Sequence, residues 1–167
     1  AVSTSGNVKS CGLNNLGQLG LGDYGTGTDR TEWTPISVIS GVDAVSAGNN
    51  HSLFRTIDGK VFACGSNYTG QLGIPSVPAS GAQTTPAEVT GLPFISQVSA
   101  GYGFSLAVAA NGDVWSWGRN EEGQLGICST DNALSPTKVK TDVLSCVNII
   151  SASGAKNPGN GKYNGHA

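Results

Sequence analysis

The sequence has few charged residues, no methionine and no long apolar run. These absences argue in turn against a nucleic-acid ligand, an initiator residue at position 1 and a membrane span. Charged residues make up 12% of the 167 residues, the net charge is −2, and the nine lysines and arginines are scattered. Direct binders of a nucleic-acid backbone carry a basic stripe, so we do not expect nucleic acid as a ligand. No apolar run approaches the ~18 residues of a membrane helix, so we expect no membrane insertion. Without methionine, residue 1 is not an initiator, and we expect a processed chain or a fragment.

Groups that perform chemistry are also scarce. The four cysteines form no C-x-x-C pair and are joined by only two histidines, so a zinc site is not expected. No G-x-S-x-G nucleophile elbow is present. Residues 20–25 spell G-x-G-x-x-G, but the helix pattern that a dinucleotide site requires does not follow. We therefore predict a protein that is not an enzyme and has neither cofactor nor metal.

Glycine, by contrast, is abundant, and its 25 residues are about twice the usual share of ~7%. Many of them belong to a thirteen-residue word, V-x-x-[CW]-G-x-N-x-x-G-Q-L-G, which occurs three times. The word occupies residues 8–20, 61–73 and 114–126, so successive copies start 53 residues apart. A long word at a constant interval is an internal repeat, and the repeat determines the architecture.

Each word is predicted to be a short strand followed by a tight turn. Valine and the Cys or Trp position suit a half-buried strand, and glycine and asparagine suit backbone with positive φ. We expect the leucine to fill the space between neighbouring units, and the glutamine amide to bind backbone groups of the turn. The predicted scaffold residues are Gly17, Gln18, Leu19, Gly20, Gly70, Gln71, Leu72, Gly73, Gly123, Gln124, Leu125 and Gly126.

The segments between the words also align. Residues 42–48 (V-D-A-V-S-A-G) match residues 95–101 (I-S-Q-V-S-A-G). Asp58-Gly59 and Asn111-Gly112 stand just before the second and third words, and both dipeptides are strong hairpin signals. A Thr-Pro or Ser-Pro step then precedes a fourth apolar run in every unit. Four short antiparallel strands in about 50 residues form one blade of a β-propeller. The sequence thus predicts an all-β fold of about three blades, with residues 1–167 as a single repeat domain.

The G-x-N-x-x-G-Q-L-G word, the V-S-A-G step, the H-S-L piece at residues 51–53 and the D-G-x-V turn resemble the repeats of the regulator of chromosome condensation family. The resemblance extends over nearly the whole chain and implies a seven-bladed closed propeller as the parent architecture. The family includes guanine-nucleotide exchange factors for a small nuclear GTPase, chromatin-associated modules and secreted bacterial inhibitors of β-lactamase. The resemblance therefore implies that the chain binds another protein.

Three blades cannot close a ring, so we expect open blade edges that a longer chain or further copies complete. Ala1-Val2 aligns with Ala107-Val108, which places the first residues in the middle of a blade strand. Residues 153–165, rich in Gly, Asn and Lys, replace the two or three residues found at this place in the other units. We predict that they form a mobile surface loop.

Cys128 and Cys146 flank the variable part of the third unit, and a disulfide between them is predicted. Closing that loop would stabilise the fold by roughly 3 kcal/mol. Cys11 and Cys64 occupy the position of Trp117, which favours small buried side chains, with a disulfide between the two as the alternative.

The low charge, the cysteines and two glycosylation-type triplets, which begin at Asn50 and Asn67, favour an extracellular or cell-surface location. The nucleus or the cytoplasm is the alternative location.

The segment between Gln-Leu-Gly and the proline varies most among the units and is longest in the first, where it spans Leu21 to Thr34. Tyr, Trp and Arg anchor protein interfaces most often, and rigid scaffolds commonly present variable loops for binding. The alternative is that Trp33 only covers its own blade. The candidate partner-binding residues are Tyr24, Asp29, Arg30, Glu32 and Trp33.

Three hypotheses of function result. The first is a non-enzymatic module that binds another protein through loops on one face. The second is a structural subunit of an extracellular fibre or surface layer, in which open blade edges pair with further copies of the chain. The third, implied by the family resemblance, is a guanine-nucleotide exchange factor for a small GTPase.

Overall fold

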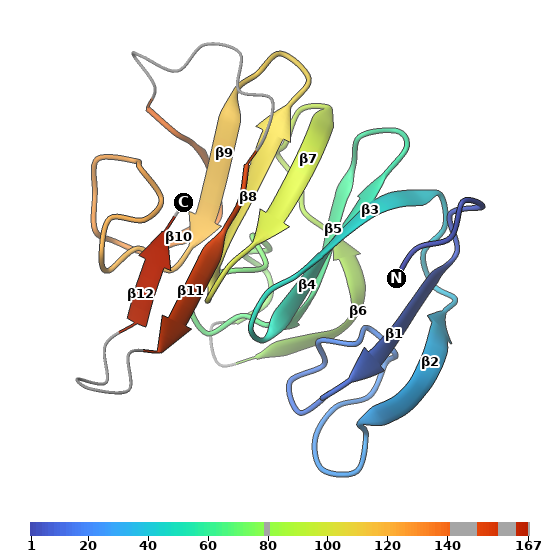
Figure 1. Ribbon diagram of the computed structural model, residues 1–167. Coiled ribbons are helices and arrows are strands. Elements are labelled where there is room, and N and C mark those ends of the chain that lie inside the picture. Colours follow the sequence, from blue (N-terminus) through green and yellow to red (C-terminus); the bar gives the residue numbers. More distant parts are fainter. Residues whose placement is uncertain (79–80, 141–149, 157–162, 167) are drawn as a thin grey trace.

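The computed structural model describes residues 1–78, 81–140, 150–156 and 163–166, and in these residues it contains strands and no helix (Figure 1). The strands in chain order are β1 (Val8–Gly12), β2 (Arg30–Ile36), β3 (Val42–Ala47), β4 (His51–Thr56), β5 (Val61–Ser66), β6 (Ala82–Glu88), β7 (Ile95–Ala100), β8 (Phe104–Ala109), β9 (Val114–Gly118), β10 (Ala133–Lys138), β11 (Ser153–Lys156) and β12 (Tyr163–His166).

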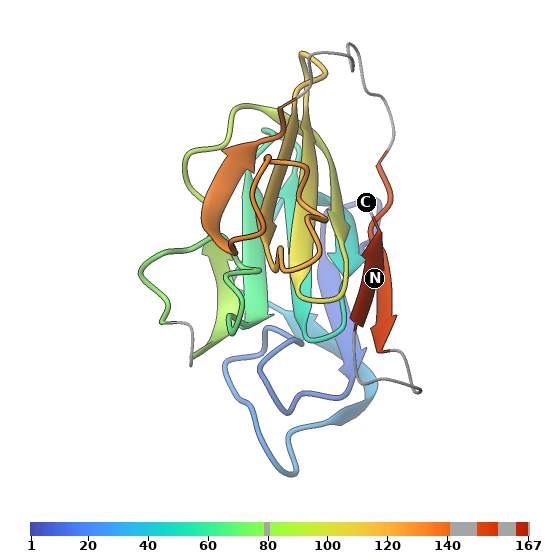
Figure 2. The ribbon, with the colours of Figure 1, turned by 90° about the vertical axis from the view of Figure 1, so that its left-hand side faces the viewer.

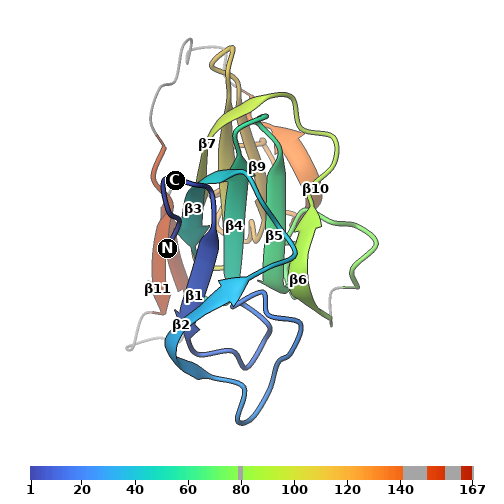
Figure 3. The same ribbon diagram turned by 90° about the vertical axis from the view of Figure 1, so that its right-hand side faces the viewer.

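The strands form blades of the predicted kind. Blade B has the order β3-β4-β5-β6 and blade C the order β7-β8-β9-β10, and all neighbours within them are antiparallel. Figure 3 shows the four strands of blade B side by side, with β1 and β2 in front of them. The pair β1-β2, here called blade A, matches the third and fourth strands of the other blades, and Val2 pairs with Val8 as Val108 pairs with Val114. The prediction of an all-β fold built from four-stranded blades is confirmed.

The fourth strand of each unit starts earlier than predicted. The sequence places it after the Thr-Pro or Ser-Pro step, but β2, β6 and β10 contain that step, as at Pro35 in β2. Proline lacks an N–H and is excluded from the middle of a sheet, although an edge strand tolerates it. These three strands are the outermost of their sheets, so the edge position explains why proline recurs there.

The predicted mobile loop over residues 153–165 is partly wrong. β11 and β12 are strands and pair with each other in antiparallel fashion, and Figure 2 shows them in red as a hairpin beside the blades. This hairpin starts directly after the third V-S-A-like segment, which ends at Ala152 and aligns with β3, so it lies where blade B has the short connection between β3 and β4. The extra residues of the third unit therefore contain two strands that the other units lack at this place. Residues 157–162, between β11 and β12, lie outside the described residues.

The hydrophobic core lies between blades. The largest cluster joins Leu53 and Leu72 of one unit to Ile95 and Trp117 of the next. A second cluster lies between blades A and B, and a third connects Phe104 and Leu125 of the third unit to Ile150 and Ala152 after it. A single four-stranded sheet cannot cover its own two apolar faces, so each blade depends on its neighbours.

Buried hydrogen bonds join the blades at the same repeat positions as the core. The backbone carbonyl of Gln71 accepts from the Ser105 hydroxyl at 2.8 Å and from Trp117 Nε1 at 2.9 Å, and both donors belong to blade C. One repeat earlier, the Gln18 carbonyl accepts from the Ser52 hydroxyl at 2.8 Å. The serine at this repeat position, Ser52 in blade B and Ser105 in blade C, is therefore the donor that connects its blade to the word of the preceding unit.

His51 extends this chain of hydrogen bonds. The ring is 1% exposed, and its Nε2 lies 2.9 Å from Ser105 Oγ. Because Ser105 donates its own proton to Gln71, His51 must donate from Nε2, which leaves Nδ1 without a proton. Nδ1 has no partner among the described residues, and complete burial lowers the pKa of His51 to about 4.

This histidine predicts an acid-sensitive fold. An unfolded histidine has a pKa near 6.5, so between about pH 6.5 and pH 4 the unfolded chain binds a proton that the folded chain does not. The stability that neutral His51 contributes is present above pH 6.5 and is lost as the pH falls towards 4, by about 3 kcal/mol. His51→Phe, which introduces the residue found at the equivalent position 104, should flatten this part of the curve. Urea unfolding of both proteins from pH 7 to pH 4 measures the slopes, and equal slopes would contradict the assignment.

Candidate protein-binding surface

The second half of each word forms a loop at one end of the blades, called here the loop end. The connections after β1, β5 and β9 all leave from this end, which faces downwards in Figure 1. In each loop the asparagine of the word is buried, and its Oδ1 accepts from the backbone N–H of the word's leucine. The three bonds are Leu19 to Asn14 at 3.1 Å, Leu72 to Asn67 at 3.1 Å and Leu125 to Asn120 at 2.9 Å.

The Nδ2 of each asparagine reaches into the variable part of its loop. Asn14 donates to Asp23, Asn67 to the carbonyl of Val77 at 2.7 Å, and Asn120 to the carbonyl of Ser129 at 2.7 Å. One buried amide therefore fixes the tight turn on one side and the variable segment on the other. This is how loops of different sequence are held on the same frame.

The glutamine of the word closes the turn from the other side. Its Oε1 accepts from a backbone N–H two positions earlier in all three copies. The bonds are Leu16 to Gln18 at 2.9 Å, Thr69 to Gln71 at 2.9 Å and Glu122 to Gln124 at 3.0 Å. The word loops are therefore ordered without help from a ligand.

In the first loop, two of the five candidate partner-binding residues are engaged within the chain. Asp29 Oδ1 accepts from the backbone N–H of Asn14 at 2.8 Å. The guanidinium of Arg30 forms an ion pair with Asp23 and a hydrogen bond with the carbonyl of Thr28. Both side chains hold their own loop around Asn14, so their main contacts are internal.

The other three candidate residues are open to solvent. Tyr24 is 60% exposed at the tip of the loop, and Glu32 and Trp33 are exposed on β2, Trp33 by 57%. Tyr24 and Trp33 thus present large apolar surface to a partner. The structure does not bring all five residues into one cluster, because Glu32 and Trp33 are neighbours in a strand and their side chains alternate between its faces.

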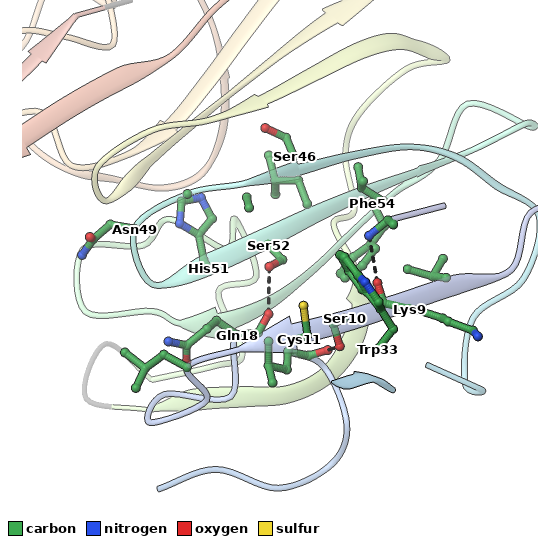
Figure 4. Close-up of a pocket in the computed structure, with 18 residues that line it drawn as sticks. Lys9, Ser10, Cys11, Gln18, Trp33, Ser46, Asn49, His51, Ser52 and Phe54 are labelled. Atoms are coloured by element: carbon green, nitrogen blue, oxygen red, sulfur yellow. Dashed lines mark hydrogen bonds between the residues drawn. The ribbon is translucent and has the colours of Figure 1, made fainter. Parts of the chain in front are cut away.

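Trp33 lies at the rim of a groove of about 360 Å³ between blades A and B. Figure 4 shows Trp33 and Lys9 on one side, with Ser52 and Phe54 of β4 facing them, and the bond from Ser52 to Gln18 across the base. Between blades B and C, the equivalent space holds the strands β3 and β4, which contact β7. The groove therefore has the lining of a surface on which strands pack.

A second pocket, which the sequence reasoning missed, lies at the loop end between blades B and C and measures about 260 Å³. It contains Tyr68 and Tyr102 and a pair of opposite charges, Arg119 and Glu121. A signal was available in the sequence, because Arg119 stands where the other two repeats have Leu13 and Ser66.

The structure bears on both disulfides considered for the four cysteines, Cys11 with Cys64 and Cys128 with Cys146. Among the described residues no disulfide is present: Cys11, Cys64 and Cys128 are free. Cys64 is buried, and burial raises the pKa of its thiol to about 12, as expected for a small packing residue. Cys128 is exposed and free, so the predicted bridge to Cys146, which lies outside the described residues, receives no support.

The structure gives little support to glycosylation at Asn67, to a metal site or to a membrane helix among the described residues. Asn67 is 3% exposed and donates from Nδ2, the atom that a glycan would need, to a backbone carbonyl. In the part of the chain that the structure describes, no group of three or more His, Cys, Asp or Glu side chains could hold a metal ion. Nor does any helix among these residues have the length and apolar character to cross a membrane.

Comparison with known proteins identifies the repeat. The sequence pattern of the Regulator of chromosome condensation (RCC1) repeat matches residues 5–55, 58–108 and 111–156. A second pattern of the same repeat matches residues 42–71 and 95–124. The matched stretches follow the 53-residue interval of the word and cover most of the chain.

Named relatives are similar over most of this chain and are themselves much longer. The chain is 36% identical to the X-linked retinitis pigmentosa GTPase regulator of Canis lupus familiaris over 83% of its length, which is 14% of that protein. It is 33% identical to the Secretion-regulating guanine nucleotide exchange factor of Bos taurus over 81% of its length, and spans 27% of that protein.

A solved structure has the same fold. Prp20p from Saccharomyces cerevisiae, a protein with binding properties to Gsp1p and histones, superposes with a TM-score of 0.78 at 29% identity. The superposition covers 85% of this chain and 36% of Prp20p.

The buried asparagine of the first word allows a test of how its loop is held. Asn14→Asp keeps the shape but removes both Nδ2 protons and sets a second carboxylate against Asp23, which should lower the free energy of unfolding by about 3 kcal/mol. Hydrogen exchange should also accelerate at the amides of residues 21–29. Asn15→Asp is the matched control, because Asn15 is exposed and only accepts, from Gln18 Nε2 at 2.9 Å. Equal effects of the two changes would contradict the role of Asn14.

Proposed function

The chain belongs to the regulator of chromosome condensation repeat family, and from this premise we propose that it is a non-enzymatic module that binds another protein through the loop end of its blades. One observation carries the proposal. The same buried asparagine and glutamine bonds hold all three word loops, while the segments that they hold differ in length and sequence. A rigid frame with divergent loops is the usual design of a binding surface.

Within this surface the first loop and the strand β2 that follows it provide exposed anchors. Tyr24 and Trp33 have the residue types most often found at the energetic centre of interfaces, and more than half of each side chain is exposed. Asp29 and Arg30 act indirectly, because they hold the loop that carries Tyr24. Glu32, exposed on β2, contributes charge at the rim.

The relatives support a protein as the ligand and an intracellular setting. Prp20p binds Gsp1p and histones, and the same yeast protein has also been solved with Kap60 bound to it. The expected extracellular location receives no support from any named relative. We therefore place the chain in the nucleus or the cytoplasm, the alternative location considered above.

The anchors can be tested with a double variant. Tyr24→Ala combined with Trp33→Ala should weaken the binding of a partner from an extract of the native cells by about thirtyfold or more, since losing even one hot-spot aromatic costs about 2 kcal/mol or more. Ile57→Ala is the control, because Ile57 is 72% exposed in the β4–β5 turn at the opposite end of the blades. Quantitative mass spectrometry compares the bound proteins. The assignment of these two residues as anchors is wrong if a partner that wild type retains is retained equally by the double variant.

A guanine-nucleotide exchange factor is the second candidate, favoured by the names of the bovine relative and the GTPase regulator. On our proposal, the chain binds without catalysing exchange. Release of fluorescent GDP from a purified small nuclear GTPase should then stay at its intrinsic rate when the chain is added. An acceleration of about tenfold, which is about 1.4 kcal/mol of barrier, would favour the exchange factor instead.

A further inference from the structure

The pocket between blades B and C is assembled from four separate connections at the loop end. The turn before β4, the word loop after β5, the turn before β8 and the residues after β9 each supply part of its wall. Its lining residues are Asn49, Asn50, Ser66, Tyr68, Thr69, Gln71, Tyr102, Gly103, Arg119 and Glu121. At about 260 Å³ the pocket has room for a side chain but not for a large ligand.

The two charges of the pocket are unequally buried. The side chain of Arg119 is 7% exposed and that of Glu121 is 61% exposed. Arg119 donates to Glu121 Oε2 from Nη2 at 2.8 Å and from Nε at 3.3 Å. A guanidinium cannot lose its charge when buried, so it needs a carboxylate beside it. Glu121 itself is mostly solvated, so it can return to water at little cost when another carboxylate takes its place beside Arg119.

A hydroxyl donor lines the same pocket. Ser66 Oγ accepts from Gln71 Nε2 at 3.2 Å and from the backbone N–H of Tyr68 at 3.5 Å. Its oxygen is therefore used as an acceptor, and its own proton is left to donate. An incoming carboxylate would meet a fixed positive charge from one blade and a hydroxyl from the other, with the ring of Tyr68, 59% exposed, at the opening.

The repeat shows that the frame does not require an arginine here. Ser66 occupies the same position one repeat earlier and binds the glutamine of its own word, at Gln71. Where Arg119 replaces this serine, the corresponding Gln124 Nε2 is buried and has no partner among the described residues. An unpaired buried donor costs stability, so the change from serine to arginine leaves the glutamine of the third word less well bonded than Gln71.

We propose that this pocket receives the carboxylate of an aspartate or glutamate side chain from the bound protein, which displaces Glu121 from Arg119. The inference rests on the proposed function and adds the chemistry that the partner presents. Glu121 acts as an internal substitute for the partner's acid: it neutralises Arg119 in the free protein and competes with the partner. Tyr68 and Tyr102 then cover the carbon chain of the incoming residue.

The test uses the whole chain, labelled with ¹⁵N, and short peptides as probes. Acetyl-Ala-Glu-Ala-amide should shift the Arg119 Nε–H and Ser66 amide signals in a saturable way, with a dissociation constant on the order of 1 mM. Acetyl-Ala-Gln-Ala-amide, which is isosteric and neutral, should not. Acetyl-Ala-Ala with a free carboxyl end distinguishes a side-chain carboxylate from a chain terminus, and saturable binding of this peptide alone would overturn the proposal.

Variants separate binding from folding. Glu121→Gln should bind the glutamate peptide about two- to fivefold more tightly, because the internal competitor is removed. Arg119→Ser, which copies the second repeat, should abolish the shifts while the melting temperature stays at or above that of wild type. Lys138→Ser, which breaks the exposed ion pair with Asp113 in another part of blade C, should leave binding unchanged. Unchanged or weaker binding by Glu121→Gln would also overturn the proposal.

The peptide-binding test of the pocket and the partner-retention test of Tyr24 and Trp33 can fail separately. If the peptides fail to bind but the Tyr24 and Trp33 variant still loses its partner, the acidic pocket is wrong and the protein-binding function stands. If the peptides bind and the partner is retained by that variant, the anchors are wrong and the pocket stands.

Discussion

The carbonyl group of Gln71, which accepts one hydrogen bond from the Ser105 hydroxyl and another from the Trp117 indole, fixes one blade against the next. Both bonds are buried, so a blade that slid by one residue would leave three polar groups unpaired, at a cost of about 1–3 kcal/mol each. The space is equally constrained: Gly73 has φ +68°, and a Cβ there would lie 2.8 Å from Trp117 Nε1. Only glycine satisfies both conditions, and the equivalent Gly20 and Gly126 also have positive φ, at +73° and +64°, which explains why the word ends in glycine in all three units.

This constraint divides the sequence into two parts. Residues that touch the next blade or close the turn recur at every interval of 53 residues, because each interface must solve the same packing problem. Residues that face solvent at the loop end are free to differ, and there the units diverge in length, charge and aromatic content. The division of labour between scaffold and binding surface therefore follows from the geometry of the blade interface.

Much of the fold could be predicted because periodic signals come from local chemistry. The strand in the word and the Asp-Gly and Asn-Gly hairpins depend on neighbouring residues. The fourth strand was placed too late because proline signals a break, and only its position at the sheet edge makes it acceptable. The hairpin of β11 and β12 has no counterpart in the other units, and its Gly- and Asn-rich composition indicates a loop, so neither the repeat nor the composition predicts it.

The binding surface was harder to predict, since a side chain's role depends on what the fold brings near it. Arg30 resembled an interface anchor, but Asp23, seven residues earlier, engages it within the loop. Nothing in the local sequence distinguishes such an arginine from a free one. Composition identified Tyr24 and Trp33 as exposed aromatics, yet it could not assemble the pocket formed by four distant connections.

Arg119 shows which signal does carry this information in a repeat protein. The other copies show which residues the scaffold accepts at each position, and here they have Leu13 and Ser66, neither of which is charged. Arg119 lies directly after an invariant glycine, replaces a serine that completed a buried hydrogen bond, and leaves Gln124 Nε2 unpaired among the described residues. The carboxylate that neutralises it is mostly in water. A position that weakens its own frame and holds its counterion loosely is better explained by a partner's acid than by the stability of the free chain.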